Sequence, residues 1–168
     1  MMTTSKAIAY GTLVAGTLDA INGVVFNYFA HNMNPVQVLQ YIASGFYGAE
    51  AFNMGLFAAA VGAVSHYFIA LVLMLIYLAA TRVSARLKAV PQLFGSLYGA
   101  AVFLTMNFVV LPLTNVVEVP VTQAFLINGL IGHALFVGLP IAIYASRVAN
   151  TAKARPHVAT LEQLLVLK

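Results

Sequence analysis

The chain has 168 residues, of which 62% are hydrophobic and 7% are charged. An average soluble domain has about 25% charged residues, so this composition excludes both a soluble globular domain and a disordered chain. The absence of cysteine excludes disulfides, thiol redox chemistry, Cys-type zinc sites and iron–sulfur clusters. The eight basic residues give a net charge of +4, but they are spread too thinly to predict nucleic-acid binding.

Four apolar stretches are each long enough to cross about 30 Å of hydrocarbon at about 1.5 Å per residue. They cover residues 7–30, 56–81, 93–113 and 123–146. The sequence therefore predicts an all-α polytopic membrane protein, with a four-helix transmembrane domain over residues 1–147 and a cytoplasmic tail over 148–168. The first stretch contains Asp19 and shows no small-residue cleavage site, so we expect a retained helix rather than a signal peptide.

The loop between the first two stretches predicts a short helix over residues 34–45 that lies in the membrane interface. Pro35 stands at a helix-start position and Gly45 at a helix-end position. The apolar residues of this segment recur at helical spacing, and we expect Gln37 and Gln40 to face away from them.

All the Lys and Arg residues fall before the first stretch, between the second and third, or after the fourth. They are Lys6, Arg82, Arg86, Lys88, Arg147, Lys153, Arg155 and Lys168. Positive charge in short loops stays on the cytoplasmic side, so both termini are predicted to be cytoplasmic. Glu50 and Glu118 are then left on the exoplasmic side.

Small residues and one proline indicate how the helices pack. Gly95-x-x-x-Gly99 and Ala58-x-x-x-Gly62 are patterns that allow two helix backbones to approach closely. Pro140 lies inside the fourth stretch, removes one backbone hydrogen bond and is expected to kink that helix.

A weak internal similarity relates the second stretch to the fourth. The alignment places Gly62, His66 and Tyr77 over Gly129, His133 and Tyr144. Two halves of two helices each have the same orientation, which predicts a possible 2+2 parallel repeat about an axis along the membrane normal. A chance match between apolar sequences is the alternative.

Polar residues from all four stretches fall at a similar predicted depth. They are Asp19, Asn22, His66, Asn107 and His133. A carboxylate at the centre of a membrane helix costs about 2.5–3.5 kcal/mol, so Asp19 is expected to face the bundle interior and to have a function. We expect Asp19 to share a proton with His66 or His133. For Asn22 and Asn107 a purely structural interhelical hydrogen bond is favoured, and for the two histidines both roles stay open.

Other chemistries have weaker support. His66 and His133 can be the axial ligands of a haem or the ligands of a metal, but the sequence has no Cys ligand and no H-x-x-x-H pair. Ser65 is next to His66, yet neighbouring side chains on a helix point about 100° apart and do not form a nucleophile–base pair. No hydrolase, Walker or dinucleotide motif is present, so the sequence does not predict an enzyme.

Several motifs carry a resemblance to known membrane proteins. They are Gly16-Thr-Leu-Asp19, the segment 38–45, Ser65-His66, Met106-Asn107 and Gly132-His133. Over residues 7–147 they resemble a widespread, largely uncharacterised family of bacterial four-span inner-membrane proteins. The second half, with its Gly-rich third stretch and Pro112-Leu113, is distantly similar to the YagU-like inner-membrane proteins linked with acid resistance. This resemblance implies a bacterial inner (plasma) membrane and a role in proton or pH handling.

The leading hypothesis from the sequence is a proton-linked or small-solute channel or transporter that uses the midplane Asp/His layer. Glu50 and Glu118 are expected at its exoplasmic mouth, and a homo-oligomer in the lipid bilayer is expected, with a path within or between protomers. The alternative is a non-catalytic accessory subunit that binds another membrane protein through its glycine faces, such as Gly95, and its C-terminal tail.

Overall fold

A computed structural model describes residues 2–148. Four long apolar helices confirm the predicted all-α polytopic architecture, and each is long enough to cross a membrane. They cover Thr4–His31 (α1), Gly55–Val83 (α3), Pro91–Leu113 and Gln123–Ser146. The predicted spans agree with these bounds within a few residues. The tail predicted after residue 147 lies outside the described residues, apart from Val148.

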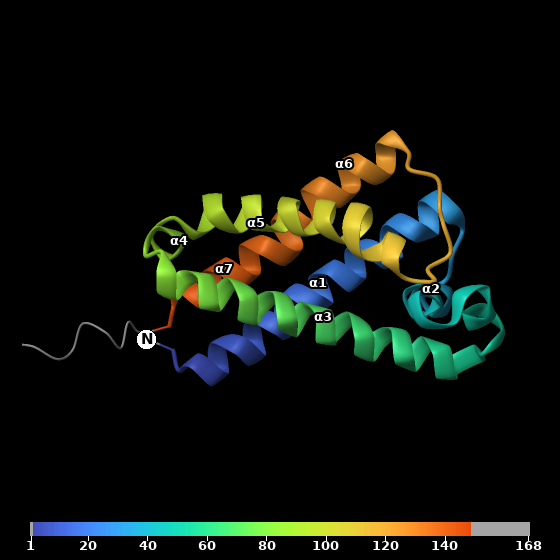
Figure 1. Ribbon diagram of the computed structural model, residues 1–168, viewed down its shortest axis with the longest axis horizontal. Helices are drawn as coiled ribbons and strands as arrows, with labels where there is room; N and C mark the ends of the chain where they lie inside the picture. Colours follow the sequence, from blue (N-terminus) through green and yellow to red (C-terminus); the bar gives the residue numbers. More distant parts are fainter. Residues whose placement is uncertain (1, 149–168) are drawn as a thin grey trace, which may run out of the picture.

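The four spans run alternately up and down, so that residues 2 and 148 meet at one end (Figure 1). There the backbone N–H of Met2 donates to the carbonyl oxygen of Arg147 at 3.0 Å. The short helix α4 (Arg86–Ala89) connects the second span to the third at this same end. We call it the basic end, because the described Lys and Arg residues gather there: Lys6, Arg82, Arg86, Lys88 and Arg147.

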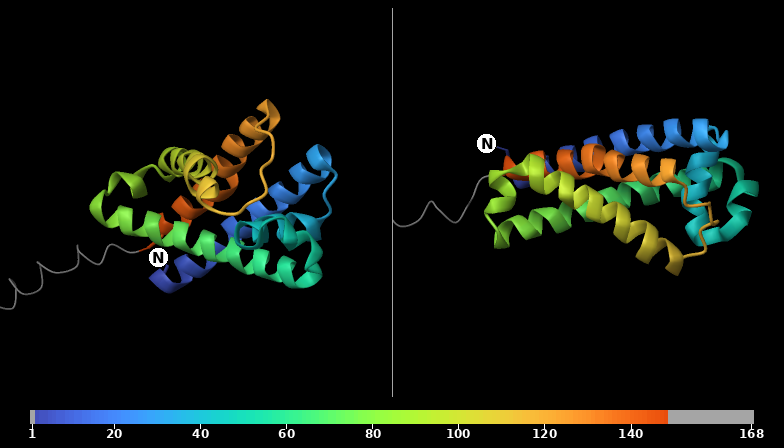
Figure 2. Two further views of the ribbon diagram at one scale, coloured as in Figure 1. Left: turned by 45° about the vertical axis from the view of Figure 1, so that its right-hand side comes forward. Right: turned by 90° about the horizontal axis from the view of Figure 1, so that it is seen from above.

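The opposite end, the loop end, is covered by α2 (Pro35–Tyr47), the 3₁₀ segment η1 (Gly48–Asn53) and the loop of residues 114–122. Figure 2 shows α2 lying across the spans rather than along them. Its N-terminus has a capping box: the Asn34 side chain accepts from the Gln37 N–H, and the Gln37 side chain accepts from the Asn34 N–H. The predicted short helix is therefore present.

One detail of the α2 prediction was wrong. The helix does not end at Gly45 but continues to Tyr47, and Gly48, with φ +59°, terminates it. The side chain of Gln40 is buried and donates to the carbonyl oxygen of Gly55 at 3.0 Å. Here α2 packs directly on α3, and a Cβ atom at Gly62 would clash with the Leu39 carbonyl.

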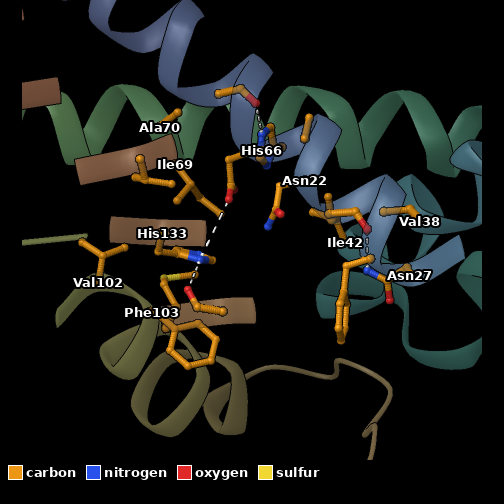
Figure 3. A pocket seen from close by; sticks show the side chains of 18 of the residues that line it. Asn22, Asn27, Val38, Ile42, His66, Ile69, Ala70, Val102, Phe103 and His133 are labelled. Carbon is orange, nitrogen blue, oxygen red and sulfur yellow. Dashed lines mark hydrogen bonds and ion pairs between the residues drawn. The ribbon is translucent and has the colours of Figure 1, made fainter. Parts of the chain in front are cut away.

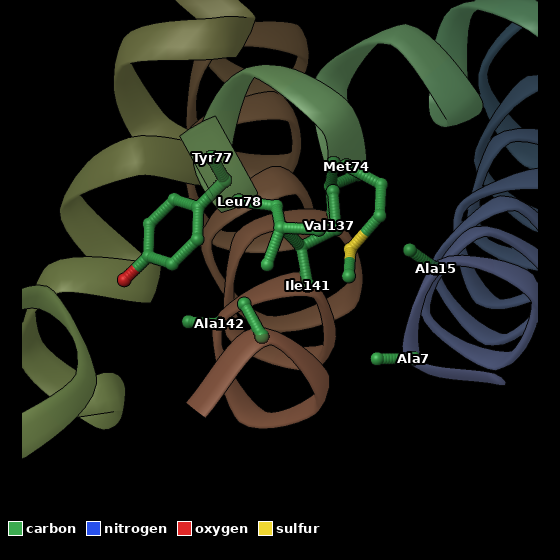
Figure 4. Packing of buried hydrophobic residues seen from close by; sticks show 9 residues of the cluster. Ala7, Ala15, Met74, Tyr77, Leu78, Val137, Ile141 and Ala142 are labelled. Atoms are coloured by element: carbon green, nitrogen blue, oxygen red, sulfur yellow. The ribbon is translucent and has the colours of Figure 1, made fainter. Parts of the chain in front are cut away.

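The larger of two clusters of buried apolar side chains extends toward the basic end. Figure 4 shows buried apolar side chains from α1, α3 and the fourth span meeting there. Met74, Tyr77 and Ile141 are almost completely buried. The Tyr77 hydroxyl donates to the Leu87 carbonyl at 3.1 Å, so this buried phenol has the hydrogen-bond partner that it needs. Side chains therefore fill the interior at the basic end.

The third and fourth spans cross at three glycines. A Cβ atom at Gly99 would meet the carbonyl of His133, and one at Gly138 would meet the carbonyl of Gly95. Close backbone approach of this kind requires residues without a side chain. The Gly95 face, which the accessory-subunit alternative assigned to a partner protein, is thus occupied by a contact within the chain.

Both of these spans leave α-helical geometry at the depth of the polar residues. The third span consists of α5 (Pro91–Thr105), the π-helical η2 (Met106–Val110) and the 3₁₀ turn η3 (Leu111–Leu113). The fourth consists of α6 (Gln123–Gly132), the π-helical η4 (His133–Gly138) and α7 (Leu139–Ser146).

A proline follows each π segment by two residues: Pro112 after Val110 and Pro140 after Gly138. Proline lacks the N–H and its ring clashes with the carbonyl four residues earlier, so the preceding turn widens instead of continuing as α-helix. The irregularity predicted at Pro140 therefore takes the form of a π segment just before it.

Candidate functional site

A cavity of about 250 Å³ lies inside the bundle, between the packed core and the loop end. It is lined by all four spans and by α2. Most of its wall is apolar, and its polar residues are Asp19, Asn22, Asn27, Tyr41, His66, Asn107, Asn128 and His133. The structure thus brings together all five residues that the sequence placed in a polar layer.

The closest charged contact in the cavity joins Asp19 on α1 to His133 on η4. One Asp19 carboxylate oxygen lies 3.9 Å from Nδ1 of His133, and both side chains are about one-fifth exposed. This distance is too long for a hydrogen bond but close enough for electrostatic attraction when His133 is protonated. In Figure 3 a dashed line from the labelled His133 ring marks this contact.

Backbone carbonyls determine which ring nitrogens carry a proton. Nδ1 of His133 lies 3.0 Å from the carbonyl oxygen of Gly129, and Nε2 of His66 lies 2.8 Å from the carbonyl oxygen of Gly16. A carbonyl only accepts, so each of these nitrogens must donate. The proton that each histidine gains or loses is therefore on its other nitrogen, Nε2 in His133 and Nδ1 in His66.

The two histidines that the repeat alignment equates have different surroundings. His66 reaches across to α1 one turn before Asp19, whereas His133 bonds to its own helix and faces Asp19 directly. His133, not His66, is thus the neighbour of the carboxylate.

The asparagines divide into two groups. Asn107 and Asn27 donate to backbone carbonyls four residues earlier in their own helices, at 2.9 and 2.8 Å, so the bond of Asn107 is not the interhelical one favoured from the sequence. Asn22 packs against the backbone of Gly132 and points into the cavity (Figure 3). Asn128 also lines the cavity.

A second cavity, of about 290 Å³, lies on the loop-end side of the first. The two share four lining residues: Tyr41, Asn107, Leu111 and Phe125. Glu118 lines the second cavity. Glu50 lines neither of these cavities, and its carboxylate instead accepts from the Asn53 side chain at 3.3 Å.

Within residues 2–148 there is no cluster of three or more His, Cys, Asp or Glu side chains that could bind a metal ion. The haem or metal alternative gains no support from this arrangement.

The sequence analysis missed three polar wall residues: Asn27, Tyr41 and Asn128. Asn27 and Asn128 were visible as amides inside apolar stretches, whereas Tyr41 enters the site only because α2 folds over it. No protein-family model matches this chain, and neither a curated protein nor a solved structure is significantly similar to it.

Proposed function

We propose that this multi-pass membrane protein moves protons, or a small solute together with protons, through the Asp19/His133 cavity. The observation that carries the proposal is the ion-pair contact of 3.9 Å at the wall of an internal cavity. Ionisable groups inside a membrane domain are costly and typically line ion or proton pathways. A carboxylate and an imidazole in contact can hold or release one proton between them.

The two ends of the bundle differ in a way that supports a pathway. Two adjacent cavities extend from Asp19 to Glu118 at the loop end, while a packed core fills the basic end. This is the arrangement of a transporter open to one side. Placement in a bacterial inner membrane, with both termini cytoplasmic, and assembly as a homo-oligomer belong to the same proposal.

The test is proton flux into proteoliposomes under an imposed membrane potential, measured between about pH 5 and 8, where histidine changes charge. We expect Asp19→Asn to abolish the flux. The variant should remain folded, because the partly exposed ion pair contributes at most about 1 kcal/mol and relief from burying a carboxylate offsets that loss.

Thr17→Val is the matched control. Thr17 lies on the same helix, but its hydroxyl bonds to Tyr67 at 2.9 Å and it does not line the cavity. Its flux should equal that of the wild type. If Asp19→Asn, shown to be folded by its melting curve, carries the same proton flux as the wild type across this range, the proposal is wrong.

A further inference from the structure

The charges around the cavity favour a cation over an anion. Asp19 lines the first cavity and Glu118 the second, whereas neither is lined by any Lys or Arg of the part of the chain that the structure describes. An anion would lie beside two carboxylates with no fixed positive charge to stabilise it. A cation would lie near one carboxylate in each of the two cavities.

The wall of the cavity favours an organic cation over a metal ion. The ring of Phe103 packs at a tilt against that of His133 with ring centroids 5.3 Å apart, Phe125 lies 5.5 Å from Phe103, and Phe26 lies 6.5 Å from Phe125. All three phenylalanines line the cavity, so an aromatic surface starts directly beside the Asp19 contact. Aromatic faces attract organic cations, while hard metal ions need several oxygen ligands.

The volume of the cavity limits the size of the ligand that it can bind. A volume of about 250 Å³ lies below the roughly 300–1,000 Å³ of pockets for drug-sized molecules. It holds the equivalent of about eight water molecules at about 30 Å³ each. An ammonium group with one small apolar substituent has this size.

We propose that the cavity binds a small amphipathic organic cation at Asp19 in exchange for one proton. This inference rests on the proposed function and specifies its substrate class. The Asp19/His133 pair is neutral when it holds one proton. When a cation binds, the site stays neutral only if that proton leaves, from Nε2 of His133 or from the carboxyl group, to water.

Other titratable groups also line the two cavities. His66 and Tyr41 line the same cavity, and Glu118 lines the next one. Tyr67, Tyr98 and Tyr144 lie on the helices packed around the pair, and their rings or hydroxyls have other partners. The other titratable side chains of these helices do not line the cavity: Lys6, Tyr10, Tyr28, His31, Tyr77 and Arg82.

The experiment uses the purified full chain and benzyltrimethylammonium, with neopentylbenzene as its neutral isostere. Calorimetry in buffers of different ionisation enthalpy counts the protons released on binding. We expect about one proton per bound cation, and an affinity that rises up to about tenfold per pH unit while the pair still holds its proton. Asp19→Asn should lose cation binding, and Thr17→Val should retain it.

A second variant tests the site without removing its charge. Phe125→Leu, at a partly exposed ring of the cavity wall, should weaken cation binding by roughly 2- to 30-fold, the range expected for a cation–π contact, and should change binding of the neutral isostere much less. Equal affinity for the cation and the isostere in the wild type, or cation binding without proton release, would overturn the inference. If proton flux depends on Asp19 but no cation binds, this inference alone is wrong. If neither Asp19-dependent proton flux nor cation binding is observed, the proposed function is wrong too.

Discussion

Tyr41 illustrates how a single side chain depends on the placement of a whole helix. It lines both cavities, because α2 lies across the loop end and directs this residue inward. The depth of a residue along a span can be counted from sequence, but the contribution of a residue outside the spans depends on how its own helix folds back. The inward position of Tyr41 was therefore not predictable.

Burial of Tyr41 has a measurable consequence. Loss of hydration raises the pKa of its phenol above the ordinary value of 10.0. A raised pKa in the folded state gives stability that is complete below pH 10 and is lost as the pH rises through the folded-state pKa. The difference in tyrosinate absorbance between wild type and Tyr41→Phe should therefore show a phenol that titrates above pH 10. A difference curve centred on the ordinary value would show that α2 does not cover this residue.

The pairing of Asp19 with His133 rather than His66 also lay beyond the sequence. Counting residues placed both histidines at the depth of Asp19, and the structure confirms that all three line one cavity. Depth does not determine the rotation of each helix about its own axis, however. The rotation of the fourth span depends on its glycine contacts with α5 and on the π segment that begins at His133.

At the scale of elements, hydropathy was sufficient to predict four spans, because each needs only length and apolar composition. The π segments η2 and η4 were harder to foresee. They result from prolines two residues downstream, and the same prolines also permit a simple kink or a helix end. Both segments contain or adjoin polar cavity residues, Asn107 and His133, as π-bulges at functional sites often do.

The glycine crossing between the third and fourth spans gives a stability prediction. A methyl group at Gly99 would meet the backbone of His133, which cannot move without displacing the π segment. We expect Gly99→Ala to lower the free energy of unfolding by about 1–3 kcal/mol, the usual cost of overpacking. Gly23→Ala is the matched control, because its methyl group meets nothing within 4 Å and alanine favours a helix interior.

Thermal melts of the two variants in the same detergent make the comparison. Gly99→Ala should melt below the wild type, and Gly23→Ala at or above it. Equal melting temperatures for the two variants would mean that the third and fourth spans do not pack at Gly99.

At the scale of the whole molecule, the basic residues and the cavities lie toward opposite ends. The described Lys and Arg residues lie at the basic end, where the core is closed, and the cavities and Glu118 lie toward the loop end. Positive residues generally stay on the cytoplasmic side during insertion, so in the proposed orientation the cavities face the other side.

The orientation can be measured directly, because the chain has no cysteine of its own. Ala49, in η1 at the loop end, and Ala85, next to α4 at the basic end, are both exposed. In intact spheroplasts a membrane-impermeant maleimide should label Ala49→Cys, and it should label Ala85→Cys only after permeabilisation. Ala101→Cys, exposed on the third span, should stay unlabelled in both cases, because a thiol facing lipid does not ionise. The reverse pattern for Ala49 and Ala85 would place the cavities on the cytoplasmic side, and labelling of both in intact spheroplasts would indicate insertion in two orientations.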